Sequence, residues 1–178
     1  MGNKEVDLLT LKRNAILLGL CGQYGKRWDG CSSKRDLVNM ALDGNGIEFM
    51  ADSIAFGWGL SKEYLQREFG DFMNGNYQCI EKGYTSEMYI GVSGVVCARS
   101  TLLLVGYCND FKVVVPKNMA CRIYMCGGSK VNIENRGHAE IYEYGTDNII
   151  HIIDYDGSYS LRQAVSKSKW NNCTGKGK

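Results

Sequence analysis

Residues 121–153, "CRIYMCGGSKVNIENRGHAEIYEYGTDNIIHII", carry the clearest structural pattern of the chain. Short runs of alternating apolar and polar residues recur there about every nine residues, and each run ends at a break that contains Gly, Ser or Asn. Alternation is typical of β-strands, whose successive side chains point to opposite faces. Recurrence predicts a chain wound in coils, because one coil cannot bury its apolar face without a similar neighbour.

The repeat extends over most of the second half of the chain. Intervals of eighteen residues, two of the short units, give columns of similar residues: Val95, Val113, Val131 and Ile149; Val105, Ile123, Ile141 and Tyr159; Cys97, Val115, Ile133 and His151. These columns predict a parallel β-solenoid in which each coil gives one strand to each of two facing sheets, with the columns in its interior. An antiparallel meander with strands of the same spacing is the alternative.

Polar and aromatic residues repeat at the same interval. Arg122 is expected beside Glu140, and Tyr124 beside Tyr142, as neighbours on adjacent strands. The same register places Lys112 beside Lys130, an adverse pair of like charges.

The first eighty residues have helical spacing instead. Apolar residues three to four apart predict one helix before Gly22 and Gly25, which we expect to begin a loop, and another in the segment "IEFMADSIAFGWG". Ser33 with Asp36 forms a capping box ahead of "LVNMAL", and Ser61 caps "KEYLQREFGDFM". We therefore predict an α+β protein: a helical domain over 1–83, a β-repeat, solenoid-like domain over 84–165 and a flexible polar tail over 166–178.

Composition excludes several classes of function. The 178 residues contain 21 basic and 19 acidic side chains, without the basic excess of a nucleic-acid-binding face. No run approaches the ~18 apolar residues of a membrane span. The apolar run before Cys21 resembles a lipoprotein leader, but it is shorter than the usual ~7–15 residues, so we expect no export. Eight cysteines without a CxxC pair predict free thiols in a reducing cytoplasm, with neither a metal nor a cofactor bound.

The helical front end closing on "LSKEYLQREFGDF", followed by strands such as "CRIYMCGGSKVNIENRGHAEIYEYGTDN", resembles a group of uncharacterised small bacterial proteins, many encoded on prophages or other mobile elements. The resemblance covers residues 8 to 160. It implies the two-part layout and a bacterial, intracellular setting, and it implies no catalytic residues. This chain departs from the group in its many cysteines.

Four residues are candidates for chemistry. Asp154 and Asp156, two apart, would share one face of a strand like the carboxylates of a β-helix polysaccharide lyase or hydrolase, although "DYDGS" also reads as a turn. His151 falls in an apolar column, which predicts an interior or edge position rather than a catalytic one. Cys31, just ahead of the Ser33 cap and close to two basic residues, is the best candidate for a reactive thiol.

The remaining prediction concerns binding. The alternation predicts an outward row of aromatic and charged residues suited to a contact surface: Arg122, Tyr124, Glu140, Tyr142 and Tyr144. We therefore expect a non-enzymatic interaction module with a protein or glycan partner, and the lyase or hydrolase is the alternative. Nothing after "SLRQAV" resembles a cap for the last coil, which makes self-association at that end an expectation as well.

Overall fold

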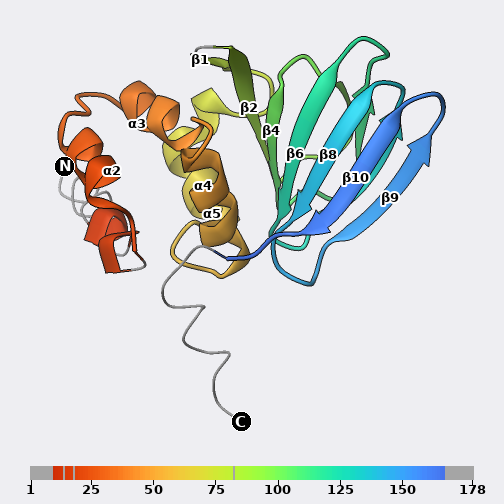
Figure 1. The fold of residues 1–178 in the computed structure, drawn as a ribbon. Helices are drawn as coiled ribbons and strands as arrows, with labels where there is room; N and C mark the ends of the chain where they lie inside the picture. The colour runs from red at the N-terminus through yellow and green to blue at the C-terminus, as the bar shows by residue number, and fades with distance from the viewer. Residues whose placement is uncertain (1–9, 14, 18, 82, 167–178) are drawn as a thin grey trace.

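The computed structural model describes residues 10–13, 15–17, 19–81 and 83–166. Helices come first and strands follow, as the α+β prediction requires (Figure 1). Residues 10–13 and 15–17 are helical, and the helices that follow are α2 (Gly22–Asp29), α3 (Lys34–Ala41), α4 (Gly46–Ala55), α5 (Lys62–Phe69) and the 3-10 helix η1 (Gly70–Phe72). Within the described residues, no helix combines the length and apolar character needed to cross a bilayer.

The predicted helix caps are confirmed. Ser33 and Asp36 form a reciprocal capping box at the start of α3, and the Ser61 hydroxyl accepts a hydrogen bond from the Tyr64 amide at the start of α5. The loop expected after Gly22 is wrong, because that segment forms α2. Tyr24 and Trp28 are four residues apart on one face of α2, but Gly22 and Gly25 within the same eight residues favour a loop.

The strands form a parallel solenoid. They are β1 (Cys79–Glu81), β2 (Tyr84–Ile90), β3 (Gly94–Cys97), β4 (Leu102–Gly106), β5 (Phe111–Val115), β6 (Ala120–Cys126), β7 (Lys130–Asn135), β8 (His138–Glu143), β9 (Ile149–Asp154) and β10 (Ser158–Gln163). From β2 onward the chain alternates between two sheets, ordered β1-β2-β4-β6-β8-β10 and β3-β5-β7-β9. Every pairing from β2 to β10 is parallel, which excludes the antiparallel meander.

The register differs from the predicted interval of eighteen. Val113 pairs with Ile133, twenty residues on, and Ile133 pairs with Ile152, nineteen residues on. The interval is eighteen only between β6 and β8, where Ile123 pairs with Ile141. The predicted stack of Val113, Val131 and Ile149 is therefore wrong, because the turns between strands differ in length from one coil to the next.

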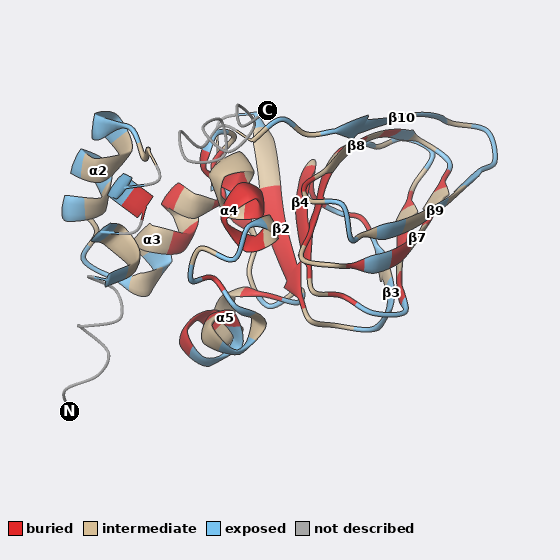
Figure 2. Ribbon diagram, turned by 90° about the horizontal axis from the view of Figure 1, so that it is seen from below, coloured by how far each residue is buried: buried red, intermediate tan, exposed pale blue. Residues whose placement is uncertain are grey.

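Two apolar clusters hold the fold together. One fills the solenoid between its two sheets and includes Val113, Ile123, Ile133 and Ile141. The other lies between the helices and the outer face of the larger sheet (Figure 2). Helix α4 lies over β4 and β6, and α5 contacts β2, so the helices cover a face of the sheet rather than its end.

At the N-terminal end of the solenoid the larger sheet is protected, whereas β3 of the smaller sheet bonds only to β5 among the described strands. Strand β1 pairs antiparallel with β2 and covers the edge of the larger sheet. Inside the first coil, the fully buried Glu87 carboxylate accepts from Arg99, with Nη2 and Oε1 2.6 Å apart, and Arg99 also donates to the Gly75 carbonyl. An antiparallel strand and an inward-facing charge are both common protections of a sheet edge.

Candidate interaction surface

The predicted tyrosine row exists, but helices cover most of it. The rings of Tyr124 and Tyr142 stack with centroids 5.7 Å apart, and Tyr144 lies 6.4 Å from Tyr124. Tyr124 is only 1% exposed and Tyr144 only 4%, because both belong to the cluster that includes Ile47 of α4. The prediction that these two side chains face solvent is wrong, and their stack forms part of the core.

The rim of this row remains accessible. Arg122 and Glu140 form the expected ion pair, with Nη2 and Oε2 2.7 Å apart, and the guanidinium lies 5.4 Å from the centre of the half-buried Tyr142 ring. The hydrogen bond from Arg122 lowers the pKa of the Glu140 carboxyl below its ordinary value. The adverse lysine pair does not occur, because Lys112 pairs in register with Asn132 and bonds to Glu134 across 2.7 Å.

The carboxylates and the histidine near residue 151 do not converge. His151 of β9 pairs with Asn132 of β7, and its side chain is exposed on the outer face of the smaller sheet. The predicted interior position of His151 is therefore wrong. Asp154 lies on the opposite face of β9, because side chains alternate along a strand, and it accepts from the buried Asn135 amide at 2.7 Å. Asp156 is exposed in the turn between β9 and β10. The "DYDGS" segment is thus a turn, as one of the two interpretations predicted.

Cys31 lacks the environment of a nucleophile. Its thiol is half-buried and donates to the Arg27 carbonyl, with Sγ and O 3.3 Å apart. Burial, together with the charge of Asp36, raises the pKa of the Cys31 thiol, whereas an activated thiol needs a lowered pKa. Across the described residues, no group of three or more His, Cys, Asp or Glu side chains is arranged to hold a metal ion.

The exposed apolar surface lies at the C-terminal end of the solenoid instead. Tyr159 and Leu161 of β10 pair with Ala139 and Ile141 of β8, both fully buried, and so continue two interior columns. In the last coil these columns reach solvent, with Tyr159 50% and Leu161 46% exposed. Within the described residues, the core of the solenoid is therefore only half covered at this end.

The smaller sheet ends in the same way. Ile150 and Ile152 of β9 continue the columns of Val131 and Ile133, but they are half-buried where their neighbours are buried. Six of the eleven exposed large apolar side chains in the described chain lie in residues 149–165: Ile149, Ile153, Tyr155, Tyr159, Leu161 and Val165. We call the surface formed by β9 and β10 the open end.

The backbone of the open end is also unpaired on one side. Among the described strands, β10 bonds only to β8 and β9 only to β7, so one edge of each faces outward (Figure 1). Such edges accept a further strand through their free N–H and C=O groups. The sequence predicted that nothing after "SLRQAV" caps the last coil, and it placed Tyr159 inside the solenoid without predicting its exposure. The predicted polar tail over 166–178 lies, apart from Ser166, outside the described residues.

Comparison of the chain with protein-family models, with curated proteins and with solved structures finds no match.

Proposed function

We propose that this chain is a non-enzymatic interaction module that binds a partner polypeptide at the open end of its solenoid. The observation that carries the proposal is the exposure of the interior columns at Tyr159 and Leu161, next to unpaired strand edges. Strand addition satisfies both features at once, because the new backbone bonds to the edge and its alternate side chains cover the columns.

The chemistry of the open end favours a polypeptide over a glycan. An apolar covering is needed to extend the core of the solenoid over its last side chains, which are Ile150, Ile152, Tyr159 and Leu161. A strand supplies apolar side chains at the two-residue spacing of the columns, whereas a glycan supplies mostly hydroxyl groups.

A second copy of this chain meets these requirements directly. Each copy offers the same uncovered columns and the same free edges, so a twofold axis can join two open ends in an isologous contact. At the opposite end, β1 and the Glu87–Arg99 pair protect the larger sheet, whereas β3 of the smaller sheet keeps a free edge. A contact between two open ends is closed on itself, so it gives a dimer and does not extend into a fibre.

The setting we propose for the module is a bacterial cytoplasm. The seven described cysteines are free thiols, which suits a reducing compartment. The resemblance to prophage-type bacterial proteins supports a gene carried on a mobile element, and a small protein that binds other proteins is consistent with such an origin.

Sedimentation velocity over a wide range of protein concentration tests the proposal. We expect the unmodified protein to form a dimer, and the double variant Tyr159→Lys, Leu161→Lys to stay monomeric with an unchanged circular dichroism spectrum. Val95→Lys is the matched control, because Val95 is an exposed apolar residue at the other end of the smaller sheet. A protein that is monomeric at every concentration, or a double variant that still dimerises, refutes the assignment.

A further inference from the structure

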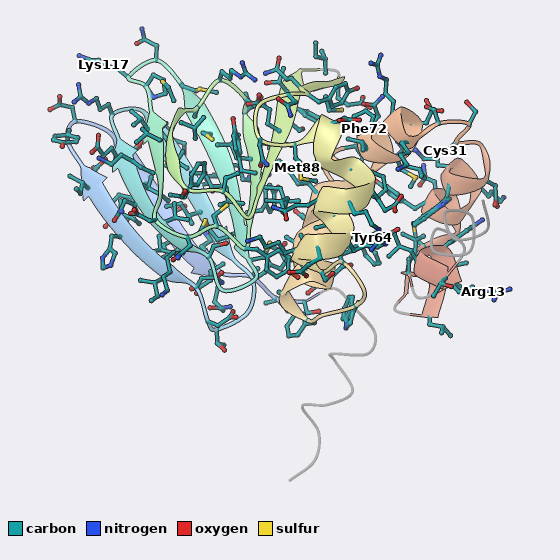
Figure 3. The ribbon with its side chains drawn as sticks, turned by 180° about the vertical axis from the view of Figure 1, so that it is seen from behind. Arg13, Cys31, Tyr64, Phe72, Met88 and Lys117 are labelled. Carbon is teal, nitrogen blue, oxygen red and sulfur yellow. The ribbon has the colours of Figure 1, made fainter. Side chains whose placement is uncertain are left out.

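The helical part of the chain contains a large apolar cavity. It lies between α2, α3, α4 and α5, and Met88 of β2, which faces the helices, forms part of its wall (Figure 3). Its volume is about 340 Å³. The cavity is partly open to solvent, so its wall is an accessible apolar surface, and such surfaces commonly mark binding sites.

Five aromatic side chains lie in the wall among more numerous aliphatic and methionine side chains. Tyr24 and Trp28 come from α2, Phe49 from α4, Trp58 from the loop that follows α4, and Phe69 from α5. The Phe49 and Trp58 rings lie 6.5 Å apart at an interplanar angle of 51°, and thus face the space at different inclinations. Such a wall offers ring faces and ring edges to an apolar molecule.

Two polar groups near the wall, the Asp43 carboxylate and the Ser53 hydroxyl, make hydrogen bonds within the protein. Tyr24 and Arg27 both donate to the Asp43 carboxylate, which also accepts from the Gly46 amide at 2.6 Å. The Ser53 hydroxyl donates to the Phe49 carbonyl at 2.7 Å. Asp43 and Arg27 neutralise each other behind the wall, and none of the described residues that line the cavity is charged, so these residues offer no counter-charge to an ionised ligand.

The size of the cavity limits the ligand further. About 340 Å³ is near the lower end of the ~300–1,000 Å³ range of small-molecule sites. We propose that this cavity binds a compact, uncharged apolar molecule with a flat ring system. The site is separate from the open end, and the inference does not depend on the proposed function.

Binding of N-phenyl-1-naphthylamine, a neutral two-ring dye that fluoresces in apolar surroundings, tests the proposal on the full chain. We expect saturable binding of one dye per chain, with quenching of tryptophan fluorescence, since Trp28 and Trp58 line the cavity. The related anion 1-anilinonaphthalene-8-sulfonate should bind at least tenfold more weakly. Equal binding of the two dyes contradicts a site for uncharged molecules.

Two cavity-filling variants locate the site. Ala41→Phe and Ala15→Phe add a ring from two different walls, and each should weaken dye binding at least tenfold while the variant still unfolds cooperatively. The double variant Tyr159→Lys, Leu161→Lys is the control for dye adsorbed at the open end, and it should bind the dye normally. Unchanged binding in either folded filling variant, or loss of binding in the control, overturns the assignment.

Discussion

Separate alanine substitutions of Ile141 and Leu161 measure how open the last coil is. The two residues are paired in one interior column, but Ile141 is fully buried and Leu161 is 46% exposed. Replacing a buried aliphatic side chain by alanine costs about 2–5 kcal/mol, which is the expected loss for Ile141→Ala. Full burial of a leucine contributes about 1.5–3 kcal/mol, so the covered half of Leu161 corresponds to roughly 0.8–1.6 kcal/mol in the monomer.

Urea unfolding followed by circular dichroism, at several protein concentrations, provides the assay. At low concentration Ile141→Ala should be the more destabilised variant. At high concentration the gap between Leu161→Ala and the unmodified protein should widen, because a dimer covers the exposed half of Leu161 and binding to the folded form adds stability. Equal losses for the two variants at low concentration refute the open column, and a gap that is independent of concentration refutes its role in assembly.

Four further outcomes follow from the described contacts. Tyr124→Ala should lower the free energy of unfolding by about 3–5 kcal/mol in urea melts, since the ring is buried and stacked. A loss below about 1 kcal/mol would contradict the burial of the Tyr124 ring. Asn135→Ala should cost about 1–3 kcal/mol and speed hydrogen exchange in the turn before β10, because its buried amide donates to Asp154 and Ser158, the residues on either side of that turn. Glu140 has a lowered pKa, so its ion pair stabilises the protein above the unfolded value of about 4.3 and stops doing so as the pH falls through the folded value. Glu140→Gln should therefore lose less than about 1 kcal/mol at neutral pH, and nothing in acid unfolding experiments below the folded pKa. Iodoacetamide at pH 8 should label the exposed Cys97 and spare Cys121, because burial raises the pKa of the Cys121 thiol to about 12. Mass spectrometry of the peptides measures the labelling, and a labelled Cys121 beside an unlabelled Cys97 would contradict the prediction.

The sequence was sufficient to predict the class of fold. Alternation in the second half and helical spacing in the first are local properties, and both survive changes in the connecting turns. The exact stacking was not predictable in the same way, because turns of different length shift one strand against the next without disturbing the alternation in either. His151 illustrates the effect: a register of eighteen places it inside, and the actual pairing with Asn132 places it outside.

The tyrosine row shows a second limit. Alternation assigns Tyr124 and Tyr142 to the same face of a sheet, and the structure agrees. Whether that face meets water or another element depends on where α4 packs, which is a long-range contact. Tyrosine is compatible with either environment, so its identity could not distinguish a core position from a contact surface.

The cavity and helix α2 were even harder to predict from the sequence than the tyrosine row. Gly22 and Gly25 favour a loop, and the helical spacing of α2 consists of a single pair, Tyr24 and Trp28. The aromatic residues around the cavity come from four separate segments, so only the packed helices bring them together.

The cover provided by α4 has a consequence for how this chain can change over evolution. Because α4 spans β4 and β6, the coils to which they belong are fixed by the shape of the helix above them. The coil formed by β9 and β10 makes its strand pairings only with its predecessor, although Ala164 and Ser166 just after β10 contact the helical part. Duplicating or removing such a unit leaves the contacts of α4 with β4 and β6 intact. Relatives of different length should therefore gain or lose material in steps of about one winding, all of it at the far end of the coiled ribbon.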